Sequence, residues 1–394
     1  MEGLQLHSNL IYENHLDTDK FSRMLDDPSQ CYKFYWLEAI VHLLTMTDED
    51  LSFDQIIDEM ICEAWYSVTR YHLHLGPTIK GKSENFLEHA INVIDSNSEL
   101  PPSATKEDIL KAITANEALI KSDKTNLIVY VPYRLLSSFL DAIGGGDRIW
   151  DQHKRFIAYI EALNKESPLL YTIIDGKGLQ KKVRVNPYWK QLITDNYPVI
   201  VSWIQLKKIR FLQDRNPGVP GIIYKLSSEN EGARKLTHAR ALWKCATEAS
   251  HLTVTDIYSG VVLDTKQFDL DHFVPWSFVA NDELWNLVPM DRRLNSSKSN
   301  RLPMWEIYFS GLAAAQYGLY KSVFAYPVVR EAFEKCRRDN LNAIWATDTL
   351  YVEGNTREKF YAILEHNLRP IYDSAYLQGY GVWKMPEHLL GEHQ

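Results

Sequence analysis

The stretch from residue 258 to residue 303 constrains the fold of this 394-residue chain more than any other segment. An apolar and aromatic run leads into Asp271-His272, a loop follows, and extended texture resumes at Asn286-Leu287-Val288-Pro289. The next residues, RRLNSSKSN, are typical of the start of a helix. Short apolar runs that are bounded by turn signals are consistent with strands. The stretch therefore predicts the order strand, loop, strand, helix.

The first 120 residues predict a helical domain. Thr105, with Asp108 three residues later, resembles a capping box that opens a helix running toward Ile120. Further upstream, residues recur at three- and four-residue steps on one helical stripe that must end near Gly76-Pro77. The residues of this stripe are Ile57, Ile61, Ala64, Trp65, Val68 and His72.

The middle of the chain is less regular. The runs 127–131 and 171–174 are predicted as short strands, although buried helix segments give equally short apolar runs. Helices are expected over 199–214 and 231–249. The triplet Gly144-Gly145-Gly146 is interpreted as a plain turn, because a phosphate-binding loop needs a Gly-Lys-Ser/Thr ending and Asp147-Arg148 follows instead.

Charge is distributed unevenly along the chain. Residues 1–120 hold 8 Lys and Arg against 21 Asp and Glu, a balance of −13, whereas the remainder has a balance of +5. Such a division fits a chain of which only the second part approaches a polyanion; chance segregation of solvated charges is the alternative. Four distant cysteines without a CxxC pair, and a start without a basic and apolar leader, predict a reduced cytoplasmic protein without a membrane span.

Three blocks of residues in the 258–303 stretch carry a resemblance to a known family. Asp271-His272-Phe273-Val274-Pro275, Asn286-Leu287 and Asn295-Ser296-Ser297-Lys298 resemble, in order, the motif of the HNH nucleases of the ββα-metal class. The spacing of 14 residues from His272 to Asn286, and of 9 more to Asn295, is similar to the HNH domain of the RNA-guided CRISPR effector nucleases. Tyr258-Ser259-Gly260 also resembles the hairpin that precedes the motif in many members.

The resemblance implies a role for each block. His272 would act as general base on water, while Asp271 and Asn295 would hold one Mg²⁺ or Mn²⁺ ion. Independently of the family, oxygen donors suit these hard cations, and a base and a cation are what phosphodiester hydrolysis requires. Asn286 would hold the loop through backbone hydrogen bonds, and Lys298 would contact the scissile phosphate. The alternatives are a structural Asp271-His272 pair and a solvated Lys298.

The surroundings of the motif predict the remaining features. Because no cysteine pair flanks the motif, we expect no zinc, and we expect neighbouring helices to support the domain. Arg292, Arg293 and Arg301 are candidate nucleic-acid contacts beside the motif, and two further basic groups are either DNA contacts or solvated helix faces. Those groups are Lys207, Lys208, Arg210 and Arg215 in one stretch and Arg234, Lys235 and Arg240 in another. Aromatic residues near the motif are expected to pack in the core rather than to stack on bases: Trp276, Phe278, Trp285 and Trp305.

Together these features predict a mainly α chain with a small α+β part. Residues 1–120 are expected to form an acidic helical domain for regulation or partner docking, through a protein partner or self-assembly. Residues 121–244 are expected to form a mixed helical middle region, and 245–394 an HNH nuclease domain embedded in helices. The predicted function is a metal-dependent DNA endonuclease of bacterial restriction or phage defence. The alternatives are an inactive nucleic-acid-binding or scaffold protein with an HNH fold, and an HNH ribonuclease.

Overall fold

The chain divides into two compact units. The computed structural model describes residues 4, 6, 8–26, 28–77, 84–140, 152–227, 234–250, 253–264 and 268–386. Unit 1 comprises Met1–Pro217 and Lys225–Asn230, and unit 2 comprises Gly218–Tyr224 and Glu231–Gln394. The sequence favoured boundaries at 121 and 245, but residue 121 lies inside the helix α6 and residue 245 inside α11. Both positions lie within continuous helices, so neither marks the end of a folded unit.

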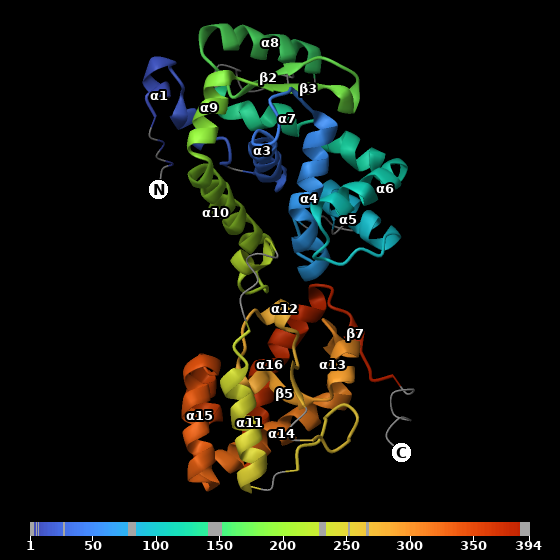
Figure 1. Ribbon diagram of the computed structural model, residues 1–394, viewed down its shortest axis with the longest axis vertical. Coiled ribbons are helices and arrows are strands. Elements are labelled where there is room, and N and C mark those ends of the chain that lie inside the picture. The colour runs from blue at the N-terminus through green and yellow to red at the C-terminus, as the bar shows by residue number, and fades with distance from the viewer. Residues whose placement is uncertain are drawn as a thin grey trace. The chain divides into compact units, whose positions relative to one another are not determined.

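Unit 1 is mainly helical (Figure 1). Its core contains the predicted stripe on α4, whose apolar members from Ile57 to Val68 are buried, while His72 ends the helix in a left-handed conformation with φ of 52°. The structure thereby confirms the predicted stripe. The helices are α1 (Leu10–Glu13), α2 (Thr18–Ser22), α3 (Tyr32–Leu43), α4 (Phe53–Tyr71), α5 (Phe86–Asn97), α6 (Lys106–Leu127), α7 (Val131–Arg134), η1 (Leu135–Phe139), α8 (His153–Glu166), η3 (Gly178–Gln180), α9 (Pro187–Asp195) and α10 (Tyr197–Arg215).

Side-chain caps explain where two of the longer helices begin. Ser52 and Gln55 form a reciprocal capping box at the start of α4. Thr105 accepts a hydrogen bond from the Asp108 N–H at 3.2 Å, as the sequence predicted for α6. These caps satisfy backbone donors that have no partner within the helix.

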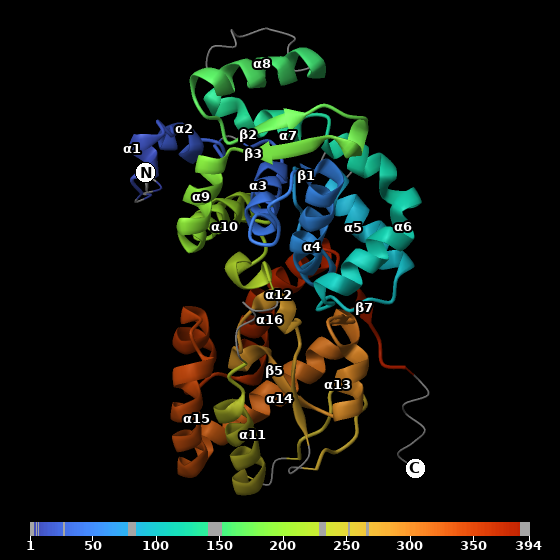
Figure 2. The same ribbon diagram turned by 45° about the horizontal axis from the view of Figure 1, so that its top comes forward.

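A small antiparallel sheet completes unit 1. Its order is β1 (Leu51–Ser52), β3 (Lys182–Val185) and β2 (Tyr171–Ile174), and α8 packs on β2 on the side away from α3 and α4 (Figure 2). The predicted strand at 171–174 is thus confirmed, but the one at 127–131 is wrong. That run includes the end of α6 and the start of α7, where Pro132 favours the first helical turn. The triplet 144–146 lies outside the described residues.

Unit 2 builds the predicted order of strand, loop, strand and helix. Strand β4 (Asp269–His272) pairs antiparallel with β5 (Leu287–Met290), with His272 opposite Leu287. Helix α13 (Arg292–Lys298) follows directly. The loop between the strands holds the short helices α12 (Trp276–Val279) and η6 (Leu284–Asn286). This arrangement confirms the mainly α fold with a small α+β part.

Longer helices surround the strand pair of unit 2 (Figure 1). Helix α14 packs against β5, α15 and α16, and α11 packs against α15. The four aromatic residues that were expected in the core are buried, and Trp305 stacks on Phe309 with ring centroids 4.4 Å apart. The remaining elements are η4 (Ile222–Lys225), α11 (Thr237–Ser250), β6 (Leu302–Pro303), α14 (Trp305–Ala325), α15 (Pro327–Asn340), η7 (Ala346–Leu350), α16 (Arg357–Leu377) and β7 (Val382–Trp383), of which β6 and β7 pair in parallel.

A helix must be both long and apolar to cross a lipid bilayer. Among the described helices, none combines enough length with enough apolar character to cross one.

Candidate active site

The loop between β4 and β5 is closed by Asn286. The Asn286 carboxamide accepts from the Val274 N–H at 2.8 Å and donates to the Val274 carbonyl at 2.9 Å. In addition, the Phe273 N–H donates to the Asn286 carbonyl at 2.8 Å. The Asn286 side chain is fully buried. Because both of its hydrogen-bonding groups are used on the backbone, Asn286 fixes the path of the chain directly after His272.

His272 is the last residue of β4, and its partner is a residue of the following loop. The His272 Nε2 atom lies 2.8 Å from Asp282 Oδ1, and the imidazole is only 5% exposed. Burial lowers the pKa of His272 and outweighs the opposite effects of Asp282 and Asp271. The ring is therefore kept neutral, and Asp282 fixes its tautomer by accepting the Nε2 proton.

Asp282 is itself held in place from two sides. Its Oδ2 atom accepts from the Lys235 N–H at 2.5 Å, and its backbone carbonyl accepts from Asn340 Nδ2 at 2.7 Å. Despite burial, the hydrogen bonds from His272 and the Lys235 N–H lower the pKa of Asp282. Asp282 was not among the predicted site residues, because no residue of the loop between the motif's first two blocks lies at a diagnostic spacing.

Asp271 points to different partners from those of His272. Its Oδ2 atom accepts from the Tyr258 hydroxyl at 2.7 Å, and its Oδ1 atom lies 3.1 Å from Lys298 Nζ. Lys298 Nζ also donates to the His272 carbonyl at 2.8 Å, so this one ammonium group joins both residues of the Asp271-His272 pair. Within the described chain, no hydrogen bond joins the Asp271 carboxylate directly to the His272 ring.

The position of Lys298 rules out one of its two sequence interpretations, that of a solvated helix residue. The side chain is completely buried, whereas a solvated helix residue would be exposed. The contact of Lys298 with the scissile phosphate stays a prediction. Burial lowers the pKa of Lys298, although Asp271 opposes this effect. Lys298 therefore acts as the counter-ion of Asp271. It is the last residue of α13, so this ion pair joins the helix of the motif to strand β4.

Helix α13 is fixed at its start by two aspartates. Asp291 caps the helix by accepting from the Arg293 N–H at 2.8 Å. The buried Asp256 accepts from the Asp291 N–H at 2.7 Å and from the Tyr258 and Ser259 N–H groups at 2.8 and 3.1 Å. The residues 254–263 form the expected hairpin, in which Thr255 pairs with Val262 and Gly260 takes a φ of +74°. Asp256 thus ties this hairpin to α13.

Asn295 lies one helical turn before Lys298 on α13. Residues three apart share one face of a helix, so Asn295 faces the same side as the lysine that contacts Asp271. In the described part of the chain no side-chain hydrogen bond of Asn295 is present, and the residue is partly exposed. The structure does not join Asn295 to Asp271 by a direct contact. Nevertheless, the Asp271 carboxylate and the Asn295 amide both offer oxygen donors, and oxygen donors suit a hard divalent cation.

The predicted arginine contacts differ from one another. Arg292 is 80% exposed and lies 3.5 Å from Asp269, and Arg293 is half-exposed and lies 3.4 Å from Asp291. Arg301 instead donates to the carbonyls of Ser297 and Lys298 at the end of α13. Arg292 and Arg293 are thus the residues of this group that project from the start of α13, whereas Arg301 caps its end.

Distant helices support the loop of the site. Gln316 of α14 donates to the carbonyls of Leu284 and Leu287 at 2.8 and 2.6 Å. The Glu283 carboxylate accepts from Trp285 Nε1 at 2.9 Å and from the Asn342 N–H at 2.9 Å. These contacts confirm the expectation that neighbouring helices hold the motif, although no sequence signal identified the residues involved.

An antiparallel strand pair followed by a helix, with a histidine ending the first strand, defines the ββα class of nuclease domains. Consistent with this class, residues 253–304 match a family model described as HNH endonuclease. Unit 2 therefore contains an HNH endonuclease domain, and the resemblance of the three motif blocks to the HNH nucleases is confirmed. Comparison of the chain with curated proteins and with solved structures finds no match in either set.

Proposed function

We propose that this chain is a metal-dependent endonuclease that hydrolyses phosphodiester bonds of DNA, with His272 as the general base. The observation that carries the proposal is the His272–Asp282 pair at the end of β4, in a segment that matches the HNH endonuclease family. HNH nucleases generally use a divalent metal. Phosphodiester hydrolysis requires a base and a cation; the neutral imidazole of His272 can act as the base, and the Asp271 carboxylate can bind a cation.

The orientation of the His272 ring determines which nitrogen acts. Asp282 holds the Nε2 proton, so the lone pair lies on Nδ1, and this atom takes the proton of the attacking water. Burial favours the neutral ring, because it lowers the pKa of His272. A protonated imidazole could not act as a base, so this environment supports the assigned role.

The metal would be held by Asp271 and Asn295. Both offer oxygen donors, and Mg²⁺ and Mn²⁺ are the cations that such donors favour. When bound, the cation would neutralise charge that develops on the phosphate and on the leaving oxygen. Tyr258 orients the Asp271 carboxylate through its hydroxyl, and Lys298 balances the carboxylate's charge.

Cleavage assays test the proposal directly. Purified protein is incubated with supercoiled plasmid, linear DNA and RNA in the presence of Mg²⁺, Mn²⁺ or EDTA. We expect DNA cleavage with either metal, no cleavage in EDTA, and a loss of about 10²- to 10⁴-fold in rate for His272→Ala. His89→Ala is the matched control, because His89 is also bonded to a carboxylate, Asp123, at 3.0 Å. Unchanged cleavage by His272→Ala would reject the assignment of the base.

The same assay separates the two alternative functions. Cleavage of RNA in preference to DNA would identify a ribonuclease, since nothing in the described site reads the sugar. Binding of DNA or RNA without cleavage under any metal condition would identify an inactive nucleic-acid-binding or scaffold protein with an HNH fold.

The biological role proposed for this activity is restriction or phage defence in the cytoplasm of a bacterium. An uncontrolled nuclease would damage the DNA of its host, so the acidic first 120 residues are proposed to dock a protein partner or a second copy of the chain. Phage plaque counts on cells that express the wild type or His272→Ala test the role. Protection that persists in His272→Ala would contradict it.

A further inference from the structure

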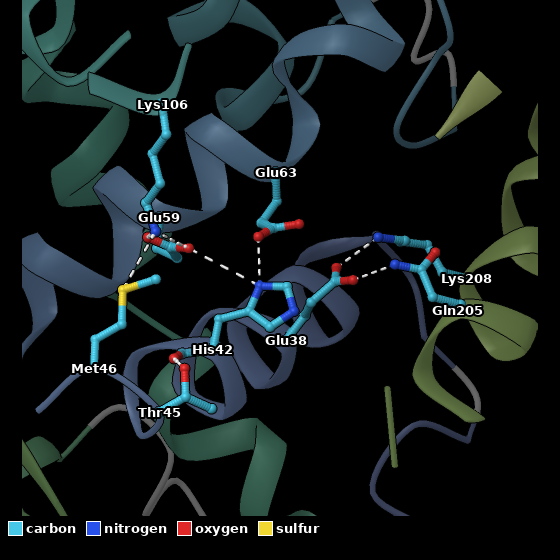
Figure 3. Close-up of polar contacts among 9 residues, drawn as sticks. All are labelled: Glu38, His42, Thr45, Met46, Glu59, Glu63, Lys106, Gln205 and Lys208. Atoms are coloured by element: carbon cyan, nitrogen blue, oxygen red, sulfur yellow. Dashed lines mark hydrogen bonds and ion pairs between the residues drawn. The ribbon is translucent and has the colours of Figure 1, made fainter. Parts of the chain in front are cut away.

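A second cluster of metal-ligating side chains lies in unit 1. His42 is in the last turn of α3, and Glu59 and Glu63 lie one turn apart on α4 (Figure 3). The His42 Nδ1 atom lies 2.5 Å from Glu63 Oε1 and 3.9 Å from Glu59 Oε1. One donor atom from each of the three residues lies within 4.8 Å of the others. Two packed helices thus direct one nitrogen and two oxygen donors toward a common point.

The charges around this cluster are short of one cation. Three carboxylates, those of Glu38, Glu59 and Glu63, lie close together (Figure 3), and among the described residues two lysines form ion pairs with them. Lys208 pairs with Glu38 at 2.5 Å, and Lys106 pairs with Glu59 at 2.5 Å. Among the described residues no lysine or arginine pairs with Glu63. Because a partly buried carboxylate is costly without a counter-charge, either a proton on His42 or a bound cation must balance it.

The donor distances fit a metal ion. Ligand bonds of roughly 2.0–2.2 Å in a tetrahedral arrangement place neighbouring donor atoms about 3.3–3.6 Å apart. The two distances from His42 Nδ1, 2.5 and 3.9 Å, lie on either side of that range, so small side-chain rotations suffice. An imidazole with two carboxylates suits Zn²⁺ or Mn²⁺ better than Mg²⁺, which prefers oxygen alone.

Lys106 is the group that a metal ion must displace. It is the first residue of α6, and its side chain is 37% exposed, so the ammonium group can turn into solvent. Lys208 differs, because it is buried against Glu38 and remains the counter-ion of that carboxylate. The end of α3 also favours a cation at this place, because the last carbonyls of a helix carry partial negative charge.

We propose that His42 Nδ1, Glu59 and Glu63 form a binding site for one divalent transition-metal ion, which would link α3 to α4. The site is separate from the nuclease motif and does not depend on nuclease activity. Metal bound there raises the stability of unit 1 by mass action, because the donors converge only in the folded state.

Calorimetric titration of the metal-free full chain with Zn²⁺ tests the proposal. We expect one Zn²⁺ equivalent that is lost in His42→Ala and Glu63→Gln but retained in His89→Ala and Asp271→Asn. His89 is the matched control, because its pair with Asp123 lacks a second carboxylate in the cluster geometry. Loss in Asp271→Asn alone would place the ion at the nuclease motif and overturn the proposal, as would unchanged binding by His42→Ala.

Lys106→Ala provides a test that does not remove a ligand. Without the ammonium group of the partly exposed Lys106, which competes for the buried Glu59 carboxylate, Zn²⁺ should bind roughly two- to fivefold more tightly. If His42→Ala or Glu63→Gln fails to fold by circular dichroism, this variant decides the question. Unchanged or weaker Zn²⁺ binding by folded Lys106→Ala would overturn the proposal.

Discussion

His42 in unit 1 and His272 in unit 2 are each hydrogen-bonded to a carboxylate, at 2.5 Å from Glu63 and at 2.8 Å from Asp282. Their pKa values nevertheless shift in opposite directions. Burial alone lowers the pKa of His42, but the hydrogen bond to Glu63 and the surrounding carboxylates together raise it. For His272, burial outweighs the carboxylates and lowers the pKa. In the metal-free chain, the balance between burial and nearby negative charge therefore separates a histidine whose protonated form is favoured from one suited to act as a neutral base.

The largest effect on stability is expected from the buried ion pair beside His272. Replacing Lys298 by Met leaves the Asp271 carboxylate buried without its counter-ion, which costs about 3–5 kcal/mol. Urea denaturation followed by tryptophan fluorescence measures the free energy of unfolding. Lys335→Met is the control, because Lys335 pairs with Glu331 on the surface and should change stability by less than about 0.5 kcal/mol. A loss below about 1 kcal/mol for Lys298→Met would show that Asp271 is solvated or protonated rather than ion-paired.

Removing the carboxylate that orients His272 tests the comparison of the two histidines most directly. We expect Asp282→Asn to lower kcat for DNA cleavage by about 10- to 100-fold with little change in KM, because the ring loses its fixed tautomer. Asp282→Glu should recover part of the loss. The control is Asp339→Asn, since Asp339 is bonded to the exposed His238 at 2.7 Å in the same unit. An equal rise in KM would indicate that Asp282 shapes substrate binding instead.

The first 120 residues, which lie in unit 1, have a charge balance of −13, whereas two exposed arginines stand at the start of α13 in unit 2, and these arginines test this local contrast. Arg292→Ala and Arg293→Ala should each weaken DNA binding by a fewfold and reduce the slope of log affinity against log salt by about 0.9. Fluorescence anisotropy at several salt concentrations measures the slope. Arg337→Ala is the control, because this exposed arginine on α15 also has an acidic neighbour, Glu334. An unchanged slope for both variants would exclude phosphate contacts by these residues.

His74 is a third histidine that is bonded to a carboxylate, and its replacement is expected to have the smallest effect, on the free energy of unfolding. Its hydrogen bond to Glu88, at 3.0 Å, raises the pKa of His74 above the usual value of 6.5. The protonated ring then stabilises the folded state fully below 6.5, and this contribution is lost as the pH rises through the folded-state pKa. The difference in unfolding free energy between wild type and His74→Ala should therefore shrink between about pH 5.5 and about pH 8.5. A difference that is constant with pH would mean that His74 stabilises only as a neutral group.

The sequence predicted the local order of the site but not its long-range partners. Strand, loop, strand and helix follow from short apolar runs and from the motif blocks, because these signals are local. Lys208 shows the limit: in the sequence it belonged to a basic stretch, yet in the fold it is buried against Glu38, which lies 170 residues earlier. The contacts of Asp282 and Gln316, and the three hydrogen bonds that Asp256 accepts, likewise form only when distant elements pack together. Composition carries no such information, so these residues could be assigned only from the structure.

The bonds of Asp256 have a mechanical consequence. Because the Asp256 carboxylate accepts from the turn of the 254–263 hairpin and from the N–H of Asp291, the residue that caps α13, the hairpin and the start of α13 are coupled. The same hairpin also reaches the strand pair, because the Tyr258 hydroxyl donates to Asp271 of β4, and Lys298 at the end of α13 donates to Asp271 and to the His272 carbonyl. A change in the conformation of this hairpin would therefore be felt at both proposed metal ligands, through Tyr258 at Asp271 and through α13 at Asn295.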